Sequence, residues 1–151
     1  MAEPIQIKID DVKLQEILKK LISKVQNLRP LMKNISGIMM DSVEENFEKE
    51  GRPDKWQELA KSTIKQRRKK GHWPGRILQV RGELASSITS YYDSDSAVVG
   101  TNKVYATIHQ FGGDAGRGKK VKIPARPYLK LTEKDLAVIN NAITKYLNSK
   151  L

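Results

Sequence analysis

Apolar residues recur at two different periods in the first part of the chain. Ile5, Ile7 and Ile9 alternate with polar residues, which predicts a short strand that carries the three isoleucines on one face. Asp10 or Asp11 can then cap a helix, because a carboxylate accepts a hydrogen bond from the first free N–H groups. The helix that follows is amphipathic, and its apolar stripe consists of Leu14, Ile17, Leu18, Leu21, Val25 and Leu28.

A second amphipathic helix is predicted from about Pro30 to Lys49. Pro30 ends the first helix and suits the first turn of the next, where its missing N–H is not needed. Gly37 costs about 1 kcal/mol relative to alanine inside a helix, so close packing is expected around it. Gly51 and Pro53 stop the helix. The pattern leaves open whether the two helices form an antiparallel hairpin or one kinked rod. The apolar stripe of this second helix consists of Leu31, Ile35, Ile38, Met39, Val43 and Phe47.

A third helical stretch is predicted to open at residues 53–56, where Asp54 and Gln57 have the spacing of a capping box. Its few apolar positions are Trp56, Leu59 or Ala60, and Ile64. Beyond Ile64 the chain is basic and polar as far as Lys70, and a loop rich in glycine and proline follows at residues 71–75.

Short strands are expected in the second half of the chain. Residues 88–92 and 97–100 flank the polar turn 93–96 and predict a β-hairpin. Residues 105–111 suggest a short helix that Gly112 and Gly113 close. Residues 112–120 contain no large apolar side chain, so they are expected to form a mobile loop. Residues 121–131 contain Pro124 and Pro127, which fit an edge strand or an extended arm.

A C-terminal helix completes the expected fold. Thr132 and Asp135 have the spacing of a helix cap, and the apolar stripe consists of Leu136, Ile139, Ile143, Tyr146 and Leu147. The pattern predicts one α+β domain over residues 1–151, with amphipathic helices packed on a small antiparallel sheet and a flexible Gly/Lys-rich loop. A helical half covers about 10–70, and the hairpin, loop and last helix cover about 77–150.

The composition limits the chemistry. The chain has 151 residues and no cysteine, which excludes a disulfide scaffold, a thiolate metal site and a cysteine nucleophile. No apolar run approaches the roughly 18 residues of a membrane span, and the N-terminus lacks the regions of a signal peptide. His72 and His109 are isolated and are interpreted as structural or surface residues. The sequence therefore predicts no catalytic residue, no metal site and no cofactor.

Charge is distributed unevenly. The net charge is +11, with basic residues concentrated at 61–82 and 112–130 and acidic residues at 41–58. If the acidic and basic regions lie on opposite faces, copies could pack head to tail and close into a ring. The alternative is nucleic-acid binding, in which Trp73, Tyr91 and Tyr92 stack on bases beside basic groups. A solvated basic face is a simpler interpretation than nucleic-acid binding.

Two segments carry a resemblance to a known family. Ile108-His109-Gln110-Phe111-Gly112-Gly113 is followed at a characteristic separation by Ile123-Pro124-Ala125-Arg126-Pro127-Tyr128-Leu129. Trp56-Gln57-Glu58-Leu59, Gly82-Glu83-Leu84 and Val99-Gly100-Thr101-Asn102 precede them in the same order. This series resembles the phage virion morphogenesis family, which includes the gpG-like proteins of Mu-like phages and their tail-completion relatives.

The resemblance implies a non-enzymatic structural role in completing the tail or joining it to the head. By analogy it implies a homo-oligomer, such as a hexameric ring, with phage tail-tube or head-connector proteins as partners. The protein would be assembled in the cytoplasm of a bacterial host and reside in the virion, with no membrane partner. Contact with packaged DNA is the less favoured alternative.

The assembly interface is predicted to include the basic arm and the segment after it. Arg126 is expected to make a directed contact with a carboxylate, with an intrachain salt bridge as the alternative. Core packing is the expected role of Tyr105, Ile108 and Phe111, whereas Trp56 and Trp73 could lie in the core or at an interface. The predicted interface residues are Arg117, Lys119, Lys120, Lys122, Arg126 and Tyr128.

Overall fold

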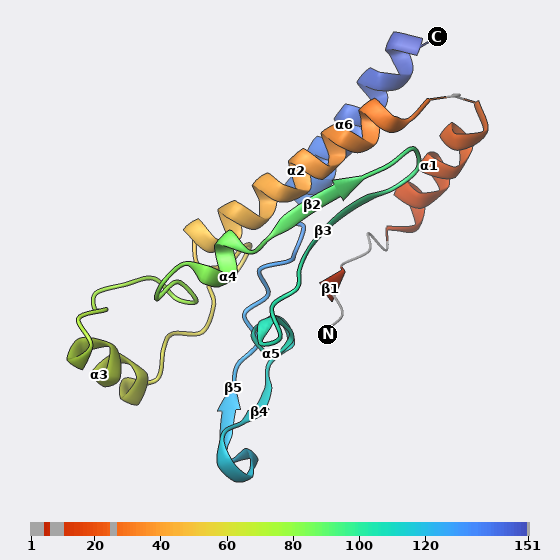
Figure 1. Ribbon diagram of the computed structural model, residues 1–151. Coiled ribbons are helices and arrows are strands. Elements are labelled where there is room, and N and C mark those ends of the chain that lie inside the picture. Colours follow the sequence, from red (N-terminus) through yellow and green to blue (C-terminus); the bar gives the residue numbers. More distant parts are fainter. Residues whose placement is uncertain (1–4, 7–10, 25–26, 151) are drawn as a thin grey trace.

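A computed structural model describes residues 5–6, 11–24 and 27–150; the side chains of 5–6 and 21–24 are not described (Figure 1). The predicted residues Ile7, Ile9, Asp10 and Val25 lie outside these ranges. The helices are α1 (Val12–Lys24), α2 (Arg29–Glu48), α3 (Lys61–Lys69), α4 (Glu83–Ser86), α5 (Ala106–Phe111) and α6 (Glu133–Lys150). The strands are β1 (Ile5–Gln6), β2 (Thr89–Tyr92), β3 (Ala97–Thr101), β4 (Gly113–Ala115) and β5 (Val121–Ile123).

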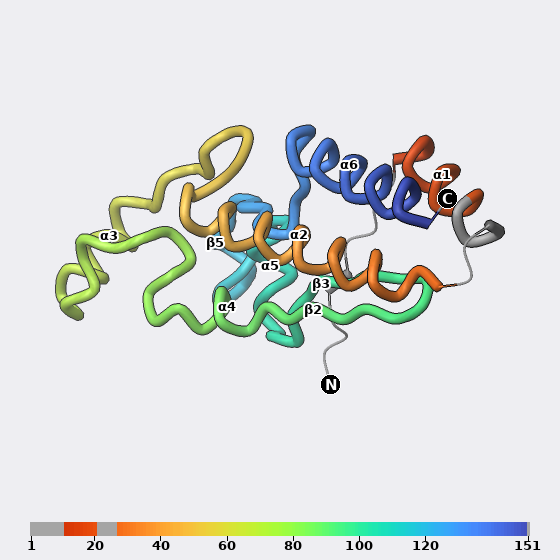
Figure 2. Tube along the Cα trace, turned by 90° about the horizontal axis from the view of Figure 1, so that it is seen from above, coloured from red at the N-terminus to blue at the C-terminus, as the bar shows by residue number. Residues whose placement is uncertain are grey.

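Helix α2 is the central element of the fold. It packs along α6 on one side and against β2 and β3 on another, as Figures 1 and 2 both show. The sheet has the order β1-β3-β2 and is antiparallel throughout, with Thr89 opposite Gly100 and Tyr92 opposite Ala97. This arrangement confirms the α+β prediction. The core combines the α2 stripe with residues of the sheet and α6, including Leu31, Ile35, Met39, Val43, Phe47, Val99, Ile139 and Ile143.

The local signals at three boundaries act as predicted. Asp11 caps α1, because its Oδ1 accepts the Leu14 N–H at 3.1 Å. At the start of α6, Asp135 accepts the Thr132 N–H at 2.8 Å and the Thr132 hydroxyl accepts the Asp135 N–H at 3.2 Å. In the β2–β3 turn, hydrogen bonds from Asp95 and Ser96 lower the pKa of the Asp93 carboxyl to about 2.

The relation between the first two helices is also defined. The chain turns back between α1 and α2, so the two are not one kinked rod (Figure 1). Leu14 is buried and Leu18 packs against the core, whereas Ile17 is exposed. The helix that packs along α2 is α6, which comes more than 80 residues later in the sequence.

The prediction that a helix opens at residues 53–56 is wrong. Helix α3 begins at Lys61, its N-cap residue Ala60 has no side-chain acceptor to cap it, and Asp54 is exposed. The reason is a tertiary contact. The buried Trp56 donates its indole N–H to the Pro127 carbonyl at 3.1 Å, and its backbone N–H donates to the backbone carbonyl of Glu50 at 2.7 Å. These bonds hold residues 51–60 in an irregular path along the body of the domain.

Residues 112–120, which were predicted to form a mobile loop, belong to a β-hairpin, and their mobility stays a prediction. Strands β4 and β5 pair with Asp114 opposite Lys122, and a 3₁₀ turn over Arg117–Lys119 connects them. Gly116 and Gly118 have φ values of 77° and 70°, which glycine adopts without strain. Backbone pairing, rather than apolar burial, forms this arm, which extends away from α2 and α6 (Figure 1).

The expectation of close packing at Gly37 is wrong within the described chain, since no atom lies within 4 Å of the position that a Cβ would take. Gly37→Ala is therefore expected to raise the free energy of unfolding by about 0.5–1 kcal/mol, because alanine has the higher helix propensity. Urea denaturation checks this. Gly112→Ala is the control and is expected to destabilise, because its Cβ would lie 2.8 Å from the Ala125 nitrogen at a φ of 74°. A neutral or destabilising Gly37→Ala would contradict the argument.

Candidate functional site

The two segments that carry the family resemblance lie against each other. The Gln110 Oε1 accepts the N–H groups of Tyr128 and Leu129 at 3.1 and 3.0 Å, and its Nε2 donates to the Leu129 carbonyl at 3.1 Å. The Arg126 N–H donates to the His109 carbonyl at 2.8 Å. One buried amide thus satisfies three backbone groups of the proline-containing segment, which would otherwise be buried without partners.

Tyr128 belongs to the core of the isolated subunit. It is 0% exposed, its hydroxyl donates to the Ala106 carbonyl at 2.8 Å, and its ring lies 5.3 Å from that of Phe47. Burial, together with the nearby Tyr105, raises the pKa of its phenol above the ordinary value. The structure therefore gives this predicted interface residue an interior position.

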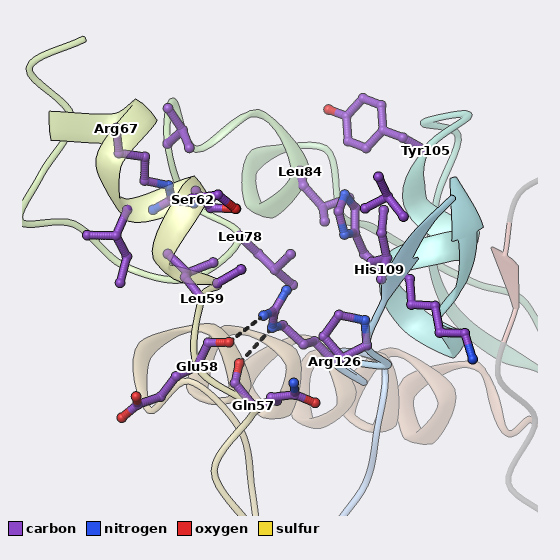
Figure 3. Close-up of a pocket in the computed structure, with 18 of the residues that line it drawn as sticks. Gln57, Glu58, Leu59, Ser62, Arg67, Leu78, Leu84, Tyr105, His109 and Arg126 are labelled. Carbon is purple, nitrogen blue, oxygen red and sulfur yellow. Dashed lines mark hydrogen bonds between the residues drawn. The ribbon is translucent and has the colours of Figure 1, made fainter. Parts of the chain in front are cut away.

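Arg126 is likewise buried, with 6% of its surface exposed. Its guanidinium donates to the carbonyl oxygens of Gln57 at 2.9 Å and Glu58 at 3.1 Å (Figure 3). These intrachain partners are backbone carbonyls, so within the described residues Arg126 does not form the intrachain salt bridge that was the alternative prediction. Burial lowers the pKa of Arg126, and the positive charge of Arg67 lowers it further.

A groove of about 1100 Å³ opens beside Arg126. It lies between α3 with the segment before it, the segment 78–84, and the α5–β5 region, and Figure 3 shows side chains from all three pointing into it. Arg67 from α3 lines it and is 8% exposed, with one Nη donating to the Arg76 carbonyl at 2.8 Å. Apolar side chains form much of the wall, including Leu59, Ile64, Leu78, Leu84, Tyr105 and Ile123.

His109 also lines the groove. Burial lowers its pKa, and the charge of Arg126 acts in the same direction, so the neutral imidazole is favoured. Its Nδ1 is buried and has no hydrogen-bond partner among the residues that the structure describes. The prediction of a structural or surface histidine is consistent with this half-buried position within α5.

Positive charge dominates the groove. Its rim includes the exposed Lys61, Arg81 and Lys122 beside Glu58 and Glu83. The ion pairs found in the described residues join Glu45 to Lys49 and Arg52, and Arg52 to Asp135. None of them includes Arg67 or Arg126. Both arginines therefore lack a carboxylate in direct contact within that part of the chain.

The remaining predicted interface residues lie on the surface. Arg117, Lys119, Lys120 and Lys122 are exposed along the β4–β5 hairpin, and their part in an interface stays a prediction. The expectation of core packing is wrong for Phe111, which is 64% exposed.

The other apolar positions considered in the sequence differ in exposure. Tyr105 is just over one-third exposed, Ile108 and Trp73 are partly buried, and Trp56 is a core residue.

Sequence reasoning missed the groove because Arg67 stands in a run of basic residues. Nothing in the pattern distinguishes its buried side chain from the exposed Arg68 beside it. Across the described residues, no group of three histidine, aspartate or glutamate side chains is placed to hold a metal ion. In the same ranges, no helix is long and apolar enough to cross a bilayer.

Comparison with known proteins gives matches along almost the whole chain. Residues 9–148 match the family described as "Phage virion morphogenesis family". The chain belongs to this family. It is 43% identical over 143 residues to "Mu-like prophage FluMu G protein 2" of Haemophilus influenzae, covering 94% of this chain and 95% of that protein. It is 32% identical over 155 residues to "Putative capsid assembly protein G" of Escherichia phage Mu, covering 100% and 99%.

A second Haemophilus influenzae relative, "Mu-like prophage FluMu G protein 1", is 30% identical over 148 residues and is covered to 95%, as is this chain. No solved structure gives a significant match. Membership of the phage virion morphogenesis family confirms the resemblance found in the sequence and supports a role in phage assembly.

Proposed function

We propose that the protein is a non-enzymatic component of the virion that completes the tail or joins it to the head. The family match over residues 9–148 carries this proposal. Copies of the chain form a ring, expected to be hexameric by analogy, and contact tail-tube or head-connector proteins. The protein is assembled in the cytoplasm of the bacterial host and remains in the particle.

The surface charges support contacts between copies. Asp41, Glu44 and Glu48 are exposed on α2, whereas the groove and the β4–β5 hairpin are basic. Two different, complementary surfaces on one subunit favour head-to-tail association, which closes into a ring when the rotation permits.

Loss of the protein in a phage that encodes it tests the role. A nonsense mutation is expected to yield heads and tails that fail to join or tails that lack their end, as seen by electron microscopy. The protein supplied from a plasmid should restore infectious particles. Normal particles without the protein would contradict the role, and turnover of peptidoglycan or nucleic acid by the purified protein would contradict the non-enzymatic part.

The β4–β5 hairpin provides a more local prediction. Deletion of residues 113–120 is expected to abolish most infectious particles, because it removes an exposed arm available to a neighbour. The subunit should still fold, since the core cluster contains no residue of the deleted segment. Plaque yield and circular dichroism measure the two effects. The triple variant R117E/K119E/K120E, which keeps the chain length, is the control for charge alone. Normal yield from the deletion would contradict a role for the arm.

DNA binding is a second candidate, because α3 and the hairpin tip both carry exposed lysine and arginine side chains. Binding through phosphates would weaken log-linearly with salt concentration. Gel shifts on duplex DNA across a salt series distinguish the two roles: tight, salt-dependent binding favours contact with packaged DNA, and weak binding favours protein contacts.

A further inference from the structure

The groove contains two buried arginine side chains that form no ion pair with a carboxylate in the described residues. Arg67 and Arg126 are both more than nine-tenths buried, and their mutual repulsion lowers the pKa of Arg126. A guanidinium has five N–H donors, yet in the described residues Arg67 makes one side-chain hydrogen bond and Arg126 makes two. Glu50 is the carboxylate whose charge acts on Arg67, and its Oε1 is already bonded to the Ile77 N–H. Buried charges are normally paired, so an anionic partner fits this groove.

The walls indicate that this partner is part of a protein. Val80 and Val121 line the groove and are 45% and 56% exposed, beside the partly exposed Tyr105. A small anion would leave these apolar side chains in water, and a nucleic-acid backbone would place phosphates against them. A polypeptide surface with carboxylates suits both the arginines and the apolar wall. Its carboxylates can pair with the arginines, and the aliphatic parts of its side chains can cover the apolar wall.

The exposed face of α2 has the matching charge. Gly37, Asp41, Glu44 and Glu48 are exposed at spacings of four, three and four residues, which places them along one line of the helix. Beyond its own helix, no described atom lies within 4 Å of the position that a Cβ at Gly37 would take, so packing inside the described chain does not explain a glycine in mid-helix. A glycine at that point lets a neighbouring backbone approach closely.

We propose that the groove of one copy receives the α2 line of a second copy, with Asp41, Glu44 and Glu48 facing the groove arginines. The rim residues Lys61, Arg81 and Lys122 surround the same carboxylates. The contact rests on the proposed assembly role and deepens it by naming the two surfaces. Because the surfaces differ, the contact repeats from subunit to subunit and generates the ring or a filament.

A charge-swap experiment tests the contact. The α2 variant D41K/E44K/E48K makes the α2 line positive, like the groove. The rim variant K61E/R81E/K122E makes the rim of the groove negative, like the α2 line. Each is expected to weaken self-association by about a hundredfold, because like charges would then meet across the contact. An equimolar mixture should restore association, since the α2 line of one variant then fits the groove of the other. Sedimentation velocity over a concentration series measures the effect for the full chain.

Matched controls separate the contact from a general charge effect. E16K/D95K/E133K changes three acidic residues outside the α2 line, and K13E/K19E/K145E changes three exposed basic residues outside the groove. Neither should alter association. Circular dichroism confirms that every variant is folded.

The outcomes distinguish the contact from the assembly role. If the wild type associates and the swapped variants associate equally well, the contact is overturned while self-association stands. A mixture that stays as weakly associated as its components also overturns the contact. A wild type that remains monomeric at every concentration overturns self-contact altogether, whereas the assembly role is judged separately by the nonsense mutation in the phage.

Discussion

Replacing Arg52 with methionine is expected to lower the free energy of unfolding by about 3 kcal/mol. Its guanidinium donates to the Asp135 Oδ2 at 3.0 Å, the Ser42 carbonyl at 3.0 Å and the Asn46 Oδ1 at 2.9 Å. The side chains of Arg52 and Asp135 are 9% and 11% exposed, so removal of the arginine leaves a poorly solvated carboxylate. The loss is placed at the low end of the range for a broken buried ion pair because water still reaches both groups. Urea denaturation at neutral pH measures it.

The charge and the geometry of this ion pair can be separated by two further variants. Arg52→Lys keeps the charge and loses the planar fork, so it should cost less than Arg52→Met. The double variant R52M/D135N removes both charges and should recover part of the loss. A cost below about 1 kcal/mol for Arg52→Met would show that the pair contributes no more than an exposed ion pair.

Acid titration gives an independent check on Asp135. Burial alone would raise its pKa, but hydrogen bonds from Thr132, Ser42 and Arg52 outweigh burial and lower it. A lowered native pKa stabilises the fold above the unfolded value, and this stabilisation is lost as the pH falls through the native value. The stability of the wild type should therefore fall below about pH 4, and R52M/D135N should show a shallower fall.

The sequence predicted those parts of the fold that depend on neighbouring residues. The stripe of α2 and the Thr132–Asp135 cap each require signals that lie within one helix, and both are confirmed. The segment before α3 could not be predicted, because Trp56 is held by Pro127, which lies 71 positions away. A local capping pattern at Asp54 carries no information about that contact.

The groove shows a different limit. The two motif segments were visible in the sequence, but the pattern did not show that Gln110 joins them by bonding the backbone of Tyr128 and Leu129. Basic residues were expected to act at the surface, yet Arg67 and Arg126 turn inward. The spacing of apolar and charged residues in the sequence indicates which helices and strands form. Packing between these elements decides which arginine is buried.

Tyr128→Ala is expected to lower the free energy of unfolding by about 4 kcal/mol, which is the usual cost of removing a buried aromatic ring. The ring packs against Phe47, and the hydroxyl bonds the Ala106 carbonyl at 2.8 Å, so Tyr128 connects α2 to α5. Tyr128→Phe keeps the ring and loses that single hydrogen bond, at a cost of about 1 kcal/mol. Urea denaturation at a concentration where the protein is monomeric compares the two variants.

This comparison decides between an interior role and an interface role for Tyr128. Truncation of an interior residue destabilises the monomer in proportion to the atoms removed. Tyr128→Ala should therefore lower the free energy of unfolding several times more than Tyr128→Phe. An interface residue would leave monomer stability unchanged in both variants and weaken association instead. Val121→Ala is the control for apolar truncation on the hairpin: Val121 is 56% exposed, so it should change monomer stability little. A large loss of unfolding free energy for Tyr128→Ala, together with a small loss for Val121→Ala, would show that Tyr128 acts in the interior. Of the predicted interface residues, the exposed basic residues of the hairpin would then be the ones available to a partner.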